Sequence, residues 1–181
     1  MHWAQRAGNL AVTSALSLRF AMRCTDLGPY RAAERSVDTP APIALPEATI
    51  LAFTRAQLGE VTDVFYRPAI PAAKEARARR AHADHLAARE PVVVLYDDTL
   101  FGSAEEGFLL TPDRLCWKNI AEEAKQLPWA LLEADKVEAS GGYVKVLGGW
   151  LQLTGRRELL EPVAALLRAL GEEAKRLSEG G

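Results

Sequence analysis

The hydrophobic pattern of this chain changes its period at Pro91, and that change limits the folds open to it. From Pro91 onward the period changes from 3.6 to 2, and short apolar runs predict β-strands, of which PVVVLY is a short buried one. Turn signals separate the runs, among them Pro112-Asp113, Gly141-Gly142 and Gly148-Gly149. We therefore expect seven short antiparallel strands within residues 91–153, with the fourth strand at an edge or bulge because it contains Pro128.

One amphipathic helix follows the predicted strands. Residues 156–177 carry an apolar stripe on one face, formed by Leu159, Val163, Leu166, Leu170 and Leu177. Pro162 is compatible with this helix because it falls in or next to the first turn, where a missing N–H costs little. The pattern predicts an α+β fold in which a compact antiparallel barrel of seven strands is capped by a C-terminal helix.

Upstream of Pro91 the pattern is helical. Residues 47–66 carry a broad apolar stripe that predicts one helix, which Pro68 and Pro71 end. A second helix is expected to begin at Pro71, with a mostly alanine face for close packing. Three prolines, Pro40, Pro42 and Pro46, predict an extended linker before these helices.

These patterns divide the chain into three parts. Residues 1–45 are expected to form an N-terminal amphipathic helical segment with the proline-rich linker. Residues 46–90 are expected to form a helical extension packed on the barrel, and residues 91–181 the barrel domain itself.

The net charge and the number of cysteines indicate which partners and which cellular compartment to expect. The net charge of −2 gives no general attraction to nucleic acid, so no nucleic-acid partner is expected. Cys24 and Cys116 are too few for a disulfide framework and lack the spacing of metal ligands. The N-terminal apolar run is too short to span a bilayer and lacks a signal-peptidase site. We expect a cytoplasmic protein.

The acidic residues after the first predicted strand have two interpretations. Carboxylates at Asp97, Asp98, Glu105 and Glu106 are suitable ligands for Mg²⁺ or Ca²⁺. Neighbours on an extended chain point to opposite faces, however, so Asp97 and Asp98 could not face one ion without a bend. Their spacing also differs from that of a calcium-binding EF-hand loop.

The second interpretation is structural, and it is the one that the residue types favour. Asp98 or Thr99 would accept backbone N–H groups in a turn, while Gly102 and Gly107 would adopt backbone angles open to glycine. We expect neither a metal ion nor a cofactor.

The stretch from Leu95 to Asn119 resembles a bacterial PH-like (pleckstrin-homology-like) family. That family carries a D-D-T-x-F-G-S motif, an acidic-Gly pair and an L-T-x-x-x-L-x-W-K hairpin. The matching positions are Asp97, Asp98, Thr99, Phe101, Gly102, Ser103, Glu106, Gly107, Leu110, Thr111, Leu115, Trp117 and Lys118. The upstream RPAIPAAKEARA resembles the Ile-Pro…Lys helix that often precedes the barrel in this family.

The resemblance covers roughly residues 66–155 and departs from the family at Glu105-Glu106, where a Lys-Asp pair is expected. A cation is therefore missing from any site that would use one. The resemblance implies a PH-like barrel without general catalytic residues, of a kind typically fused to signalling or interaction modules.

Other residues that could take part in catalysis or ligand binding are scattered along the sequence. His82 and His85 lie three apart on a predicted helix, but no third metal ligand is near them in sequence, and we expect an exposed pair. Ser103 with His82 is a conceivable nucleophile and base, although nothing in the sequence selects this pair. Tryptophans at 117, 129 and 150 are expected in the core or barrel mouth, with ligand stacking as the alternative.

The sequence therefore favours a non-catalytic PH-like interaction or adaptor module that binds a protein partner, or a second copy of itself. The expected partner surface is formed by Trp129, Arg77, Arg79 and Arg80. The binding residues would be nine of the motif, namely Asp97, Asp98, Thr99, Phe101, Gly102, Ser103, Gly107, Trp117 and Lys118. One alternative is a peripheral membrane or lipid-associated adaptor that uses these arginines or the N-terminal amphipathic helix. Another is a metal-dependent hydrolase built on the acidic loop.

Overall fold

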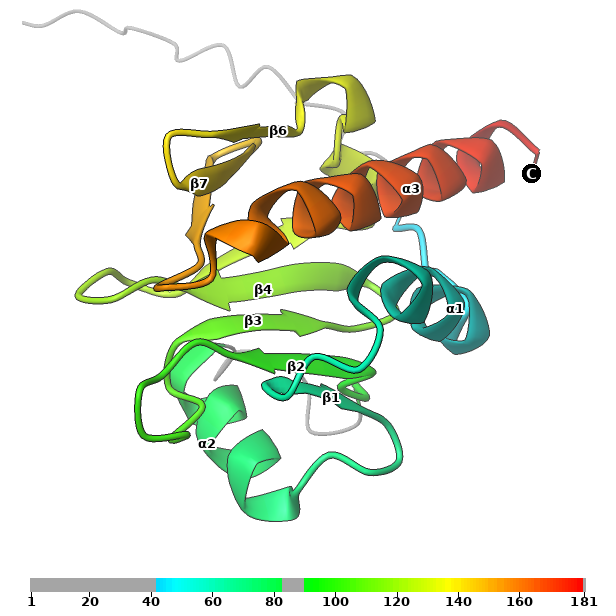
Figure 1. The fold of residues 1–181 in the computed structure, drawn as a ribbon. Helices are drawn as coiled ribbons and strands as arrows, with labels where there is room; N and C mark the ends of the chain where they lie inside the picture. Colours follow the sequence, from blue (N-terminus) through cyan, green and yellow to red (C-terminus); the bar gives the residue numbers. More distant parts are fainter. Residues whose placement is uncertain (1–41, 83–89, 181) are drawn as a thin grey trace, which may run out of the picture. The chain divides into compact units, whose positions relative to one another are not determined.

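The computed structural model describes residues 42–82 and 90–180, and its strands form two antiparallel sheets (Figure 1). The larger has the order β1-β2-β3-β4-β5, with bounds Val64–Tyr66, Val94–Asp97, Gly107–Leu110, Arg114–Lys118 and Lys125–Pro128. The smaller has the order β6-β7-β8, with bounds Glu138–Ser140, Tyr143–Val146 and Gly149–Gln152. The helices of the described ranges are α1 (Glu47–Leu58), α2 (Ala72–His82) and α3 (Leu160–Glu179).

The predicted α+β class, with an antiparallel sheet and a C-terminal helix, is confirmed. The seven runs expected after Pro91 are present in order as β2 to β8, and the predicted turns at Pro112-Asp113 and at both glycine pairs join neighbouring strands. Among the described residues, no strand pairing joins the two sheets into one closed barrel.

The larger sheet is buried on both faces, and the alternation of side chains along its strands assigns each residue to a face. Leu95, Leu109 and Cys116 pack with Ala78 of α2 on one side. The alternate residues Tyr96, Phe108 and Trp117 contribute to the larger core on the other side, which includes residues of α1, α3 and the small sheet. Burial on both faces explains why β2 and β3 read as nearly continuous apolar runs.

Helix α3 lies next to α1 (Figure 1). Side chains of the apolar stripe predicted for this helix belong to the larger core. Leu166 and Leu170 are fully buried, and Val163 is nearly so. Gly171 allows a close approach, because a Cβ at this position would lie 3.2 Å from both the Leu132 carbonyl oxygen and the Ala134 Cβ. Short 3-10 turns at Trp129–Leu131 and Ala134–Lys136 form the segment that meets the helix there.

The prediction of one helix over residues 47–66 is wrong. Helix α1 ends at Leu58, Gly59 adopts a φ of 56°, and the chain then forms β1 at the edge of the larger sheet. Pairing with β2 places Val64 opposite Tyr96 and buries Val64 in the core. Tertiary pairing has therefore overridden a local helical pattern.

The expected boundary at residue 45 also differs from the structure. Leu45 is buried in the larger core, and its backbone N–H donates to the Pro112 carbonyl at 2.7 Å. The second predicted helix is present as α2, directly after Pro71. The rest of the N-terminal segment, residues 1–41, lies outside the described residues. Within the described ranges, no helix has the length and apolar character needed to cross a membrane.

Candidate interaction surface at the ends of β2 and β4

Asp97 and Asp98 point to opposite faces of the larger sheet, as their adjacency on a strand predicts. The Asp97 carboxylate accepts hydrogen bonds from Lys74 of α2 and from the backbone N–H groups of Thr99 (3.1 Å) and Ala104 (3.2 Å). The Asp98 carboxylate accepts the Thr154 N–H at 2.8 Å and the Tyr96 hydroxyl at 3.0 Å. The first aspartate therefore fixes the turn, and the second joins the sheet to the segment after β8.

The expectation that Asp98 caps the turn is thus wrong, whereas that for Thr99 is confirmed. Thr99 Oγ1 accepts the Ser103 N–H at 2.7 Å. Gly102 and Gly107 have φ values of 67° and 119°, as the structural interpretation of the motif expects.

The two carboxylates differ in their electrostatics. Burial alone would raise the pKa of Asp97, but hydrogen bonds from Lys74 and Thr99 outweigh it and hold the pKa below its ordinary value. Burial raises the pKa of Asp98, which has neutral donors and the nearby Glu106 charge rather than a cation beside it. The Lys74 ammonium group therefore balances the negative charge of Asp97, whereas no lysine or arginine of the described residues pairs with Asp98.

Lys74 fixes the loop between β2 and β3, residues 98–106, against α2. Its ammonium group bonds to Asp97, donates to the Gly102 carbonyl at 2.6 Å and lies 5.1 Å from the centre of the Phe65 ring. Sequence reasoning did not assign Lys74 to the site. The signal was present, because Lys74 belongs to the helix that resembles the one preceding the PH-like barrel.

Asp97→Ala should lower the free energy of unfolding by about 2–3 kcal/mol, because it removes four hydrogen bonds, from Lys74, from the Thr99 N–H and hydroxyl and from the Ala104 N–H, and leaves the Lys74 ammonium without its carboxylate. Urea denaturation followed by tryptophan fluorescence measures this. Lys74→Met should have a similar effect, and the double variant should be far less destabilised than the sum of the two. Glu105→Ala in the same loop serves as the control and should change stability little, so equal losses at Asp97 and Glu105 would contradict the assignment.

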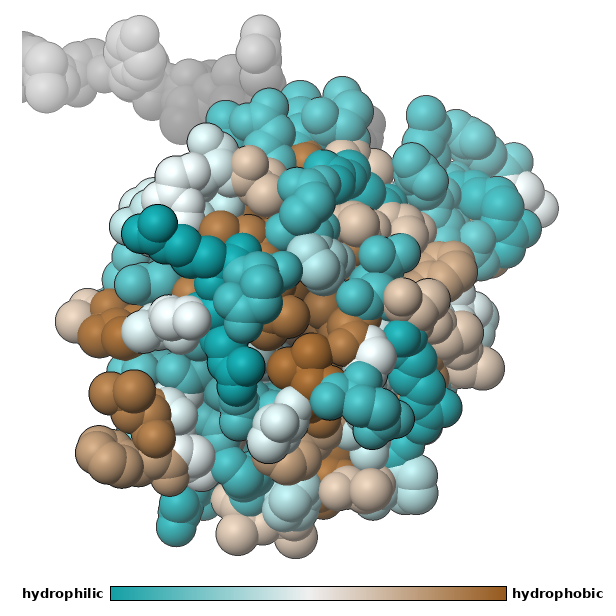
Figure 2. Space-filling model, viewed as in Figure 1, coloured by the Kyte–Doolittle hydropathy of each residue, from teal (hydrophilic) through white to brown (hydrophobic). Residues whose placement is uncertain are grey.

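Large apolar side chains protrude from this fixed loop. Leu100 is 89% exposed and Phe101 is 97% exposed, while Ile120 in the loop after β4 is 46% exposed. Figure 2 shows apolar side chains protruding at the left margin, where Figure 1 places the loops that follow β2 and β4. Together with Asp98, Glu105 and Glu106 they line a shallow hollow of about 300 Å³. We call these six residues the loop-tip surface.

The loop that carries Ile120 is also tied down. The neighbouring Asn119 is buried, and its side chain donates to the Trp150 carbonyl at 3.0 Å and accepts the Gln152 N–H at 2.9 Å. Both loops of the loop-tip surface are therefore held by buried polar side chains next to their exposed tips.

The tryptophans and Lys118 of the predicted site lie elsewhere. Trp117 is buried in the larger core, and Lys118 is partly exposed at the end of β4. Trp129 is buried too, as expected for a core residue, and its indole N–H donates to the Thr111 carbonyl at 3.0 Å. This burial contradicts the other expectation, that Trp129 belongs to the partner surface. Trp150 is 44% exposed on the small sheet, where Lys125 lies 4.8 Å from the centre of its ring.

The arginines of α2 divide into two kinds. Arg77 and Arg80 are exposed. Arg79 bonds to Glu75 at 3.0 Å and to the Glu90 carbonyl at 2.6 Å, so it ties α2 to the segment before β2.

His82 is buried, which contradicts the expectation of an exposed histidine pair. His85 lies outside the described residues. Neither ring nitrogen of His82 has a hydrogen bond of ordinary geometry to a described residue, although the Ala104 backbone is near enough to affect its charge. The pKa of His82 is lowered to about 4, mainly because burial disfavours the charged ring; the Ala104 backbone opposes this change, Lys118 contributes to it and Asp97 opposes it. No hydrogen bond joins His82 to Ser103 in the described structure.

Because the pKa of His82 is about 4 in the folded chain and 6.5 ordinarily, the unfolded chain takes up this proton first as the pH falls. The free energy of unfolding should therefore decrease between pH 6.5 and pH 4, by up to about 3 kcal/mol from this residue. Urea titrations of the wild type and His82→Leu at several pH values measure the effect. Subtracting the two curves removes the carboxylate contributions, and identical slopes would show that His82 is not buried in its neutral form.

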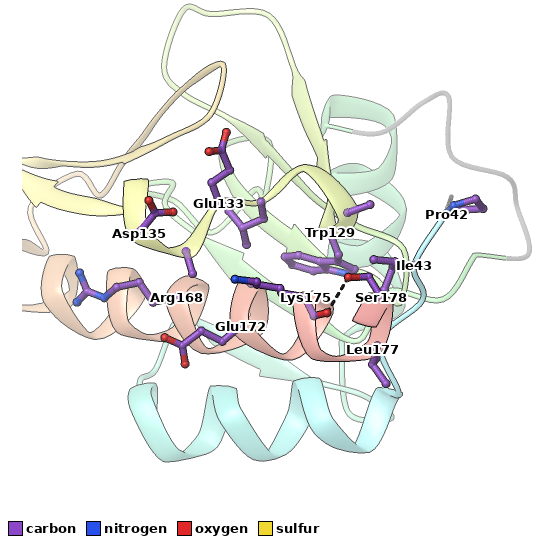
Figure 3. A pocket seen from close by; sticks show the side chains of 14 residues that line it. Pro42, Ile43, Trp129, Glu133, Asp135, Arg168, Glu172, Lys175, Leu177 and Ser178 are labelled. Atoms are coloured by element: carbon purple, nitrogen blue, oxygen red, sulfur yellow. Dashed lines mark hydrogen bonds between the residues drawn. The ribbon is translucent and has the colours of Figure 1, made fainter. Parts of the chain in front are cut away.

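A second hollow runs along α3. It has a volume of about 1090 Å³, and Figure 3 shows Trp129 beside Lys175 of the helix and Ile43 beside Ser178. The chain that precedes Pro42 lies outside the described residues, so nothing in the structure shows what covers this groove. We assign it no function.

Within residues 42–82 and 90–180, no group of three or more His, Cys, Asp or Glu side chains is arranged to hold a metal ion. Comparison with models of known protein families finds no match, and neither does comparison with curated proteins or with solved structures.

Proposed function

We propose that this chain is a non-catalytic PH-like interaction module that binds a protein partner through the loop-tip surface. The observation that carries the proposal is the exposure of two consecutive large apolar side chains, 89% for Leu100 and 97% for Phe101, on a loop fixed by buried hydrogen bonds.

Exposed apolar residues scattered singly are normal on a protein surface. Here two of them follow each other, and Ile120 from a second loop lines the same hollow. An exposed aromatic side chain on a fixed backbone suits an anchor in an interface, because little conformational entropy is lost when a partner covers it.

The arrangement of the strands supports the PH-like part of the proposal. Strands β2 to β5 and β6 to β8 are seven consecutive antiparallel strands in groups of four and three, and α3 follows them. Strand β1 is an addition at the edge next to β2. The loop-tip surface lies at one end of this arrangement and replaces the Trp129 region as the proposed contact.

A protein partner is favoured over a membrane by charge. Asp98, Glu105 and Glu106 lie around the apolar tips, and the negative surface of an anionic leaflet would repel them. We propose that the chain is not catalytic because the candidate acid and base side chains are either paired with another residue or buried. Asp97 is paired with Lys74, and burial disfavours the charged form of His82.

Site-specific photo-crosslinking tests the proposal in the full-length protein. A photoreactive phenylalanine analogue at position 101 should give discrete adducts with one protein in extracts of the native cells, identified by mass spectrometry. The same analogue at Leu147, a half-exposed residue outside the loop-tip surface, is the matched control. Adducts with lipid alone would favour the membrane alternative, and equal labelling at the two positions would refute the loop-tip surface.

A further inference from the structure

We infer that the loop-tip surface binds an extended protein segment in which a lysine or arginine stands next to a large apolar residue. This inference rests on the proposed function, since it names the chemistry of the partner for the same surface.

The first argument is uncompensated charge. Asp98, Glu105 and Glu106 line the hollow, and none of them forms an ion pair with a lysine or arginine of the described residues. Asp97, on the other face of the same strand, is paired with Lys74. The fold thus supplies a cation to one aspartate and leaves the side facing the hollow negative, where a partner's cation would fit.

The second argument concerns the position of Asp98. Its carboxylate is partly buried beneath the hollow, where its bonds to Thr154 and Tyr96 come from neutral donors. A guanidinium group can bond two carboxylate oxygens at once, and charge-assisted bonds are stronger away from bulk water. A basic side chain reaching into the hollow would therefore gain more than one at an open surface.

The third argument is the apolar rim. Leu100, Phe101 and Ile120 border the acidic hollow, so a basic side chain that enters it would lay its methylene stem along apolar surface. The Phe101 ring can also accept a cation on its face. A neighbouring apolar residue of the partner would cover the exposed tips, and the two features together specify a mixed basic and apolar segment.

Selection from a phage-displayed library of random linear peptides on the immobilised full-length protein tests this inference. Counter-selection on Phe101→Asp removes peptides that bind elsewhere. The enriched peptides should carry lysine or arginine within two positions of leucine, isoleucine, phenylalanine or methionine. Fluorescence anisotropy of the best synthetic peptide then gives its Kd.

The double variant Glu105→Gln, Glu106→Gln should weaken that peptide at least about tenfold. The double variant Glu172→Gln, Glu179→Gln changes the net charge equally on α3 and should leave the Kd unchanged. Two results would overturn this inference but leave the proposed function intact. In the first, the enriched peptides require Phe101 but contain no lysine or arginine. In the second, their Kd is the same for the wild type and for the Glu105→Gln, Glu106→Gln variant. Failure to enrich any Phe101-dependent peptide would overturn the inference, and the absence of crosslinks at position 101 would separately refute the proposed function. If the protein self-associates and Phe101→Asp abolishes this self-association, a second copy of the chain occupies the loop-tip surface. That result would also overturn the inference.

Discussion

Replacing Gly107 with alanine is expected to prevent folding, or to remove about 4 kcal/mol or more of the free energy of unfolding. Gly107 opens β3 opposite Asp97 and has a φ of 119°, which L side chains rarely adopt. An added Cβ would lie 2.1 Å from the Tyr96 carbonyl oxygen and 3.0 Å from the Asp98 backbone nitrogen. Both atoms belong to the backbone of the neighbouring strand and its loop, so no side-chain rotation can relieve the contact.

Gly148→Ala is the matched control for this substitution. Gly148 has a φ of 79° in the turn between β7 and β8, and a Cβ there would have no atom within 4 Å. Gly148→Ala should lower the free energy of unfolding by about 1 kcal/mol, which is the cost of backbone strain alone. Circular dichroism and urea denaturation compare the two variants. Similar small losses at both glycines would mean that the pairing of β2 with β3 differs from the one described.

Leu170→Ala should lower the free energy of unfolding by about 2–5 kcal/mol, and Leu166→Ala should do the same. Both side chains are fully buried where α3 covers the larger core. Truncation loses the transfer free energy of the removed methyl and methylene groups and leaves a cavity beneath the helix.

Leu147→Ala removes the same atoms from a leucine that is 42% exposed, and it should cost less than about 1 kcal/mol. Urea midpoints of the three variants provide the comparison. If Leu170→Ala cost no more than Leu147→Ala, α3 would not cover the core in solution.

The strands after Pro91 and helix α3 were predictable because local signals agree with the final packing. Turn residues separate the runs. The alternation in β7 matches the one face that it buries, and the continuous apolar runs of β2 and β3 match burial on both faces. Strand β1 was not predictable in this way. Residues 59–66 continue a helical apolar stripe, and only pairing with β2 makes them a strand.

The roles of the two aspartates were half predictable. Alternation along a strand requires Asp97 and Asp98 to point to opposite faces. Which face meets Lys74 depends on where α2 packs, and no local pattern determines that. The sequence assigned the turn to Asp98 or Thr99, and in the structure Asp97 and Thr99 hold it.

The burial of His82 had a signal that the sequence analysis passed over. Ala78 and His82 are four residues apart and share one face of α2, and both are fully buried. The exposure of Leu100 and Phe101 had no such signal. Apolar residues next to a strand ordinarily suggest burial, and only the fixed course of the 98–106 loop turns them outward.

The most direct measurement of the central claim is calorimetric titration of the protein captured at position 101 against three full-length chains: wild type, Phe101→Ala and Leu147→Ala. If the loop-tip surface binds the partner, the Kd should rise at least about tenfold in Phe101→Ala. It should stay unchanged in Leu147→Ala, which truncates an exposed apolar residue elsewhere. Equal affinity of Phe101→Ala and the wild type would contradict the claim.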